Sequence, residues 1–223
     1  MIFRIGLSAN SCLAKLQFAF DLNMRNNDEE KPKGAKAIAL KAQKKIFSNA
    51  AGGNLIKFVI DDELSMLFDH LVNLNVEYLK LQKVPNFQYL GRKVVKNMIK
   101  LGVKIGFMRH HNQLNKMELN ALSTFRSKFH SLMKALVSFY EVEFTYNREY
   151  LIDAINMCHK NLINAIQRNS TDRSLERLEA VIDFYTNEHF LDTVCGNARP
   201  AELLPHIRLI VDEIGLRLER KLL

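Results

Sequence analysis

Cationic side chains recur every four residues in the stretch 90–106, LGRKVVKNMIKLGVKIG, where they are Arg92, Lys96, Lys100 and Lys104, with Lys93 beside them. On a helix this spacing gathers them into one ridge of like charges, which repel one another unless an anion lies nearby. The pattern therefore favours binding of phosphate or carboxylate groups. The alternative is a solvated face on an ordinary core helix, and the spacing alone does not separate the two.

The overall charge points to the same chemistry without choosing a partner. The chain carries a formal net charge of +8 and has a pI near 9.4. Such a balance favours a membrane surface, a nucleic acid or a phosphorylated ligand. Aromatic residues are not interleaved with the basic ridge, and this argues against nucleic acid as the partner.

Motifs for catalysis or for metal binding are not found. The sequence has no phosphate-binding loop, no Gly-x-Ser-x-Gly and no His-Glu-x-x-His. His110 and His111 are adjacent, without an acidic or thiol ligand at metal spacing. We therefore expect no enzyme activity, no metal and no cofactor other than a bound ligand.

Cysteine usage and hydropathy indicate a cytoplasmic protein. Cys12, Cys158 and Cys195 are odd in number and widely scattered, which is typical of a reducing compartment. No apolar run approaches the roughly 18 residues of a membrane-spanning helix. Any association with a membrane is expected to be peripheral.

The apolar spacing predicts an all-α bundle of about six mostly antiparallel helices, with no repeated strand pattern. Residues 107–115 are expected to form a loop, and Gly102 and Gly106 to permit close helix contact or to end the helix. Asn115 and Glu118 have the spacing of a capping box, and Asn147 is placed to cap the next helix. Short extended segments are expected at 55–60 and 142–146.

Three regions are expected along the chain. Residues 1–33 form a variable or flexible extension, since 25–34 (RNNDEEKPKG) is polar and charged and has the composition of a linker. Residues 34–53 form a basic N-terminal helix that ends at Gly52 and Gly53. Residues 54–223 form the helical bundle.

Several stretches together resemble the tumour necrosis factor alpha-induced protein 8 family. They are residues 38–48 (IALKAQKKIFS), 59–63 (VIDDE), 96–106 (KNMIKLGVKIG), 125–148 (FRSKFHSLMKALVSFYEVEFTYNR) and, more loosely, 206–218 (HIRLIVDEIGLRL). The piece at 125–148 is the most specific, because it joins a helical stripe to an extended break.

The resemblance implies a fold and a function. The family fold is an all-helical bundle of death-effector-like, reversed topology around a long central hydrophobic cavity. Its members bind phospholipids and phosphoinositides, with the tails in the cavity and a basic mouth around the headgroup. The resemblance further implies lipid transfer, lipid second-messenger signalling, regulation of apoptosis or inflammation, and peripheral association with the inner leaflet of the plasma membrane.

Site residues carry over from the resemblance one by one. Lys44 and Lys45 match the double lysine of the family's mobile N-terminal helix, and with Lys41 they are expected to dock the membrane. Arg126 matches a headgroup arginine of the mouth. In an ungapped alignment His110 occupies the position of the family's other mouth arginine, and Arg109 lies one residue earlier. Arg126, Arg109 and His110 are therefore the candidates for binding the headgroup. Apolar candidates for the cavity lining are Leu71, Met98, Leu122, Phe129, Ile155 and Ile210.

The periodicity alone leaves a different interpretation open. The same apolar residues at the same spacing also make a solid core. In that case the protein is a helical adaptor of the cell-death or immune signalling type, which binds signalling proteins through its surface and carries no lipid.

Overall fold

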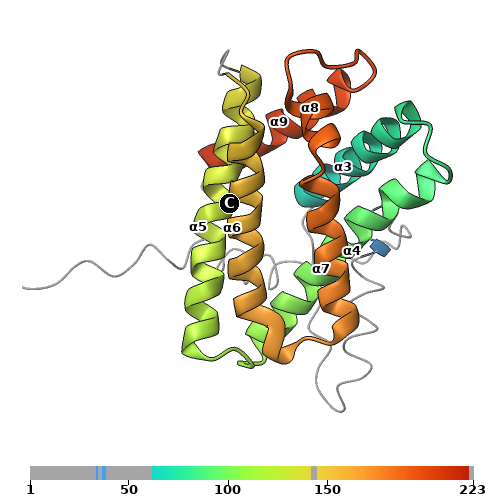
Figure 1. Cartoon of the computed structure of the whole chain (residues 1–223). Helices are drawn as coiled ribbons and strands as arrows, with labels where there is room; N and C mark the ends of the chain where they lie inside the picture. Colours follow the sequence, from blue (N-terminus) through green and yellow to red (C-terminus); the bar gives the residue numbers. More distant parts are fainter. Residues whose placement is uncertain (1–33, 35–36, 39–61, 142–144, 221–223) are drawn as a thin grey trace, which may run out of the picture.

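The structure is a computed structural model that describes residues 62–141 and 145–220, together with Gly34, Ala37 and Ile38 (Figure 1). Over these residues the regular structure is helical and no strand occurs, which confirms the predicted all-α class. The predicted extension at 1–33 and the predicted extended segment at 55–60 lie outside the described residues, as does most of the predicted N-terminal helix.

Seven α-helices and one 3-10 turn make up the described bundle. The α-helices are α3 (Asp62–Leu81), α4 (Phe87–His110), α5 (Lys116–Glu141), α6 (Arg148–Ile166), α7 (Asp172–Tyr185), α8 (Glu188–Cys195) and α9 (Leu204–Glu219), and the 3-10 turn is Gln167–Asn169. The sequence pattern predicts about six helices and leaves 188–195 unassigned. The difference is α8, whose eight residues are too few to show a helical period.

The helices close into a ring through their main contacts. Around it, α3 packs on α4, α4 on α7, α7 on α6, α6 on α5, α5 on α9, and α9 returns to α3. Figure 1 shows α5 and α6 side by side along the length of the molecule, with α4 and α7 opposite them and α3 and α9 across one end. The short α8 contacts α5, α6 and α7 near that end.

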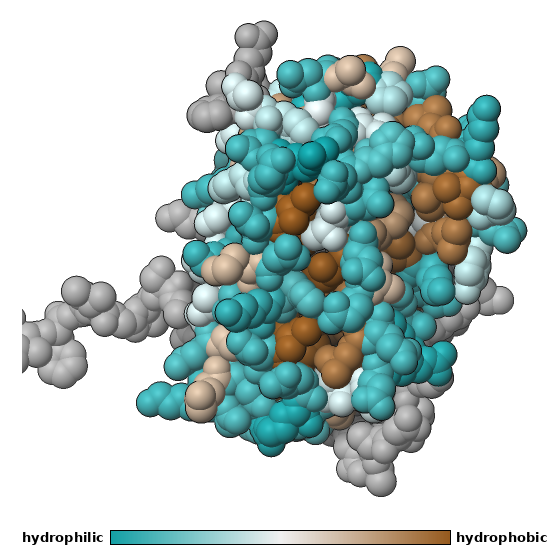
Figure 2. Space-filling view, in the orientation of Figure 1, coloured by the Kyte–Doolittle hydropathy of each residue, from teal (hydrophilic) through white to brown (hydrophobic). Residues whose placement is uncertain are grey.

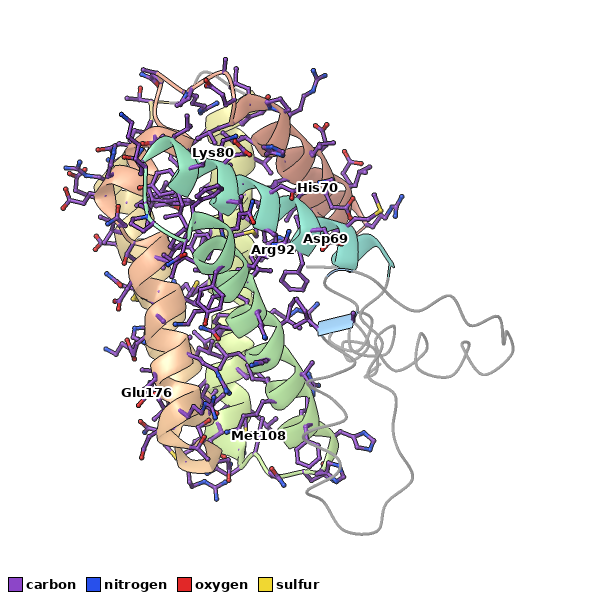
Figure 3. The ribbon with its side chains drawn as sticks, turned by 90° about the vertical axis from the view of Figure 1, so that its right-hand side faces the viewer. Asp69, His70, Lys80, Arg92, Met108 and Glu176 are labelled. Atoms are coloured by element: carbon purple, nitrogen blue, oxygen red, sulfur yellow. The ribbon has the colours of Figure 1, made fainter. Side chains whose placement is uncertain are left out.

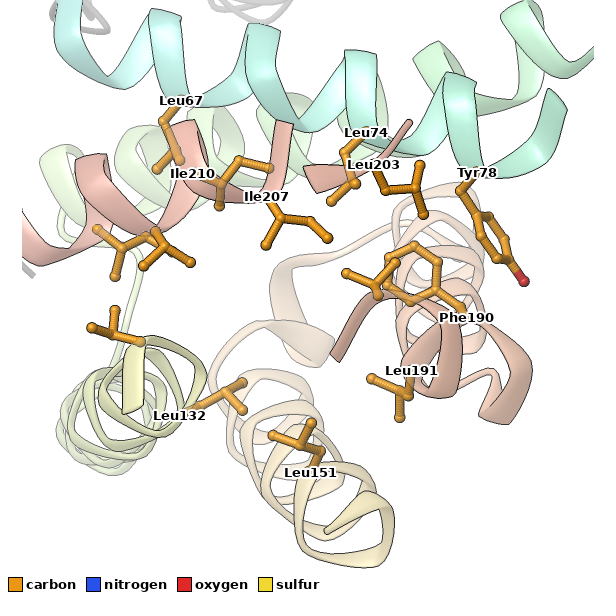
Figure 4. Close-up of a cluster of buried hydrophobic side chains, with 14 of the residues drawn as sticks. Leu67, Leu74, Tyr78, Leu132, Leu151, Phe190, Leu191, Leu203, Ile207 and Ile210 are labelled. Carbon is orange, nitrogen blue, oxygen red and sulfur yellow. The ribbon is translucent and has the colours of Figure 1, made fainter. Parts of the chain in front are cut away.

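Three clusters of buried apolar side chains hold the ring together. The largest joins α3, α5, α6, α8 and α9, and its members Leu151 and Leu203 are fully buried (Figure 4). A second is the α4 row Val95, Ile99 and Val103, against which Ile38 packs. The third joins α4, α6 and α7 around Met108. Each fully buried aliphatic side chain contributes about 1.5–3 kcal/mol to folding.

A glycine brings α3 and α4 into close contact, although it is not one of the two expected from the sequence. A Cβ atom on Gly91 would lie 2.9 Å from the backbone nitrogen of Val76. By contrast, Gly102 has open space where a Cβ would stand, and α4 continues through both Gly102 and Gly106. Next to this contact the buried Asn75 amide donates to the Tyr185 hydroxyl at 3.1 Å, which ties α3 to α7.

The helix ends confirm both caps and correct one loop. The Asn115 side chain accepts from the Glu118 backbone nitrogen at 2.9 Å, and Glu118 Oε2 accepts from the Asn115 nitrogen at 2.7 Å. Asn147 accepts from the Tyr150 nitrogen. The predicted loop at 107–115 is wrong over its first four residues, because α4 runs to His110. Buried Met108 packs in the third cluster and holds this last turn in place.

Candidate functional site

The corrected end of α4 determines where the predicted headgroup residues lie. Arg109 is in the last turn of α4 and Arg126 is in the first half of α5, and residues 111–115 connect the two helices. The capping box at Asn115 fixes the start of α5. Arg168 donates to both oxygens of Glu118 at 2.7 and 2.8 Å, and thereby ties this connection to the turn after α6.

Arg109 and Arg126 lie close enough for their charges to interact. Both are half-buried. Burial lowers the pKa of Arg109, and the nearby charge of Arg126 lowers it further. In the described part of the chain, no carboxylate forms an ion pair with either guanidinium. Two partly desolvated like charges without a counter-ion are unfavourable, and an anion bound between them would remove that cost.

His110, the third headgroup candidate, lies apart from this pair. It is exposed, and its ring meets the edge of His111 at 5.1 Å between centroids. Consecutive residues on a helix point about 100° apart, so Arg109 and His110 face different directions. Arg109, one position before the ungapped match, is the residue whose charge interacts with that of Arg126.

An apolar strip begins beside Arg126 and follows α5. Its members are all half-buried and are spaced three or four residues apart: Leu122, Phe125, Phe129, Met133 and Leu136. The Phe125 and Phe129 rings stack at 5.7 Å. Phe125, Phe129, Met133 and Leu136 pack against the largest core cluster, so this strip (hereafter the α5 strip) faces other helices of the ring.

The other predicted lining residues differ in their surroundings. Leu71 and Ile155 are half-buried and pack against the largest cluster, whereas Ile210 is a buried member of it. Met98 is half-buried on α4 and joins none of the three clusters. These positions are compatible with a lined interior and with a packed core alike.

The predicted membrane-docking residues lie outside the described part of the chain, since Lys41, Lys44 and Lys45 fall within residues 39–61. No described helix is long and apolar enough to cross a bilayer. The face drawn in Figure 2 is covered mostly by polar side chains, and apolar ones emerge in separate patches between them.

A groove of about 710 Å³ runs between α4 and α7, away from the Arg109–Arg126 pair. The predicted basic ridge forms one of its walls, with Arg92, Lys93, Lys96 and Lys100. Arg173 and Arg177 on α7 form the opposite wall, and the sequence reasoning missed both. Their four-residue spacing at the start of a helix is the same signal as the α4 ridge. It does not reveal which helix faces which.

Comparison with known proteins matches nearly the whole described chain. A family model described as "Tumor necrosis factor alpha-induced protein 8-like" matches residues 33–221. Tumor necrosis factor alpha-induced protein 8-like protein 1 of Danio rerio is 33% identical over 185 residues, which cover 82% of this chain and 95% of that protein. Tumor necrosis factor alpha-induced protein 8 of Bos taurus is 32% identical over 190 residues, covering 84% of this chain and 90% of that protein. The chain therefore belongs to the tumor necrosis factor alpha-induced protein 8 family.

Proposed function

We propose that this protein binds phospholipids, phosphoinositides in particular, and carries them between membranes. The observation that supports this most directly is the half-buried Arg109–Arg126 pair, which has no acidic partner among the described residues and lies at one end of the α5 strip. A cationic pair beside an apolar strip matches the two parts of an anionic lipid.

The tails require an apolar place to leave the bilayer. Each buried CH₂ is worth about 0.8 kcal/mol, so a two-chain lipid enters water only at a prohibitive cost. An apolar interior of comparable size makes the exchange nearly neutral. A ring of helices, in which each member packs mainly on two neighbours, is compatible with such an interior.

The headgroup would bind to the two arginines. A guanidinium offers a planar pair of donors that suits phosphate oxygens, and partial burial strengthens each charge-assisted hydrogen bond. In this proposal Leu122 and Phe129 contact the upper parts of the tails, because they flank Arg126 on α5. Leu71, Met98, Ile155 and Ile210 line the remainder, and Lys41, Lys44 and Lys45 dock the protein on an anionic membrane.

The proposed cellular role follows the family. Lipid transfer at the inner leaflet of the plasma membrane would make this a cytoplasmic regulator in lipid second-messenger signalling, apoptosis or inflammation. The alternative is an adaptor for signalling proteins that carries no lipid, and a measurement of lipid transfer separates the two.

The test is transfer of a fluorescent phosphoinositide between vesicles by the full chain. We expect Arg109→Gln combined with Arg126→Gln to reduce transfer by about tenfold or more, because two charge-assisted hydrogen bonds are lost. The matched control is Lys134→Gln with Lys160→Gln, which removes the same charge from exposed positions on α5 and α6. Equal transfer by both variants would refute the headgroup role. Native mass spectra without co-purified phospholipid, together with no transfer by the wild type, would favour the adaptor.

The two neighbouring residues on α4 give a finer test. Arg109→Gln alone is expected to weaken binding to phosphoinositide vesicles, whereas His110→Gln is expected to leave it within about twofold of the wild type, since Arg109 is the residue whose charge interacts with that of Arg126. Vesicle flotation at fixed ionic strength measures both. The reverse order would show that the headgroup binds on the exposed side of α4.

A further inference from the structure

The groove between α4 and α7 concentrates positive charge on two facing walls. Among the described residues that line it, six side chains are cationic and one, Glu176, is acidic. Figure 3 views this side of the molecule, with Arg92 on α4 and Glu176 on α7 labelled. From Arg92 to Lys100 the α4 wall extends about 12 Å at 1.5 Å per residue.

Four of these six cationic side chains have no ion-pair partner among the described residues. They are Arg92, Lys96, Arg173 and Arg177. Lys93 lies over the Tyr89 ring at 5.9 Å. Burial lowers the pKa of Arg177 and Arg173 lowers it further, whereas Glu176 raises it. The fold therefore brings like charges together and withdraws Arg177 partly from water, a cost that a bound polyanion would offset.

About one helical turn beyond Lys100, the fold fixes a further cation in place. Lys104 Nζ donates to the buried Ser174 hydroxyl at 3.1 Å, and this bond joins α4 to α7. Burial lowers the pKa of Lys104, with a smaller contribution from Arg177. The two walls are thus held at a set separation at this end.

The shape of the groove selects the class of anion. A volume of about 710 Å³ lies within the usual range for small-molecule sites, roughly 300–1,000 Å³. Single-stranded nucleic acid requires several aromatic platforms for its bases, and among the described residues that line the groove Tyr89 is the one aromatic.

We propose that this groove is a second anion site, separate from the Arg109–Arg126 pair, that binds a compact, multiply phosphorylated small molecule of the inositol phosphate type. The α4 lysines and arginine contact phosphates from one side, and Arg173 and Arg177 contact them from the other. The same phosphates can come from a soluble compound or from a lipid headgroup that projects from a membrane. The site does not depend on the proposed lipid cargo, because it shares no residue with that binding region.

The experiment is isothermal titration calorimetry of the full chain with inositol hexakisphosphate at roughly 150 mM salt, where weak surface pairing is screened. We expect one molecule bound per chain. Lys96→Gln with Arg177→Gln is expected to weaken binding by about tenfold or more, since one charge is removed from each wall. Arg92→Gln with Arg173→Gln alters only exposed positions and is expected to act in the same direction. It serves as the second test if the first variant fails to fold.

Two control variants separate binding in this groove from binding elsewhere on the surface. Lys134→Gln with Lys160→Gln removes the same charge elsewhere and should leave the dissociation constant within about twofold of the wild type. Arg109→Gln with Arg126→Gln should also leave it unchanged. If that second pair abolishes binding while the groove variants retain it, the polyphosphate binds at the headgroup pair and the groove proposal is wrong. An equal loss of affinity in every variant would show that the polyphosphate is attracted non-specifically by the protein's charge, and this result would also overturn the groove proposal.

Further experiments identify whether the bound phosphates belong to a soluble compound or to a lipid headgroup. Vesicles of phosphatidylcholine with and without a phosphoinositide are tested by flotation, with and without inositol hexakisphosphate as competitor. Groove-dependent flotation that the competitor abolishes assigns the site to a lipid headgroup. Calorimetric binding without such flotation assigns it to a soluble compound. An oligonucleotide of equal charge that binds more tightly, with loss in the groove variants, would replace the small-molecule proposal with a nucleic acid interface.

Discussion

At the scale of single residues, Glu118 stabilises the connection between α4, which carries Arg109, and α5, which carries Arg126. Its carboxylate is 7% exposed, accepts two bonds from Arg168 and caps α5 through the Asn115 nitrogen. The hydrogen bond from Arg168, followed by the backbone bond from Asn115, lowers the pKa of Glu118 from 4.5 to about 2. The placement of Arg126 relative to Arg109 therefore depends on an ionised carboxylate.

This shifted pKa predicts how stability varies with pH. Between pH 2 and 4.5 the unfolded chain binds the Glu118 proton and the folded chain does not, so stability rises with pH across that window. The contribution is fully present above about pH 4.5 and is lost as the pH falls toward 2. Urea unfolding of Glu118→Gln should show a deficit at pH 6 that disappears near pH 2.

The control for this measurement is Glu202→Gln, which alters an exposed carboxylate outside the network. It should change stability little at either pH. A deficit in Glu118→Gln that is equally large at pH 2 and pH 6 would mean that the side chain acts through packing and not through its charge.

The sequence predicts this region in part. The capping box is a local pattern of residues three apart, so the residue types alone identify it. The meeting of Arg109 and Arg126 is different, since it depends on α4 extending four residues beyond the predicted end. Glycines at 102 and 106 suggest a stop, and only the packing of Met108 against residues far along the chain overrides that local preference.

At the scale of helices, α8 contributes more to the core than its length suggests. Three of its eight residues, Phe190, Leu191 and Val194, are buried in the largest cluster. The Phe190 ring meets Tyr78, Phe184 and Tyr185 at 4.9–5.4 Å between centroids. Asn187 caps the helix by accepting from the Phe190 nitrogen at 3.0 Å.

Two substitutions in α8 should differ in their cost. Phe190→Ala is expected to lower the free energy of unfolding by about 3–5 kcal/mol, because it removes a buried ring and leaves a cavity. Asn187→Ala is expected to cost about 1 kcal/mol, the usual value of a lost N-cap. Chemical denaturation at neutral pH measures both. Equal, small costs would mean that α8 is peripheral to the cooperative unit.

Helix periodicity predicts the long elements well, for a physical reason. The helix α5 is 26 residues long, so its amphipathic pattern repeats several times. In α8 it repeats barely twice, so the helix depends on tertiary burial and not on a visible period. The facing of α4 and α7 across the basic groove is likewise a tertiary result that no local spacing encodes.

At the scale of the whole molecule, the ring of helices provides a test of whether the interior is open or solid. If Phe129 faces an open interior, Phe129→Ala should cost the lipid-free protein only about 0.5–1.5 kcal/mol, the value of its stacking with Phe125. On the same helix Leu132→Ala, at a position that is 6% exposed, should cost about 2–5 kcal/mol. Thermal and urea unfolding give both values.

Added lipid should sharpen this difference. A ligand that binds only the folded state raises the melting temperature by mass action, so phosphoinositide should stabilise the wild type more than Phe129→Ala. Comparable costs for Phe129→Ala and Leu132→Ala, with no stabilisation by lipid, would indicate a solid core and favour the adaptor.

The close approach at Gly91 restricts how such a ring can move. With no side chain between them, the backbones of α3 and α4 touch at this point, and separating them would expose buried peptide groups. We therefore expect α3 and α4 to move together as one rigid hairpin. Any widening of the ring is then expected between other pairs of neighbouring helices, while α3 and α4 keep their positions relative to each other.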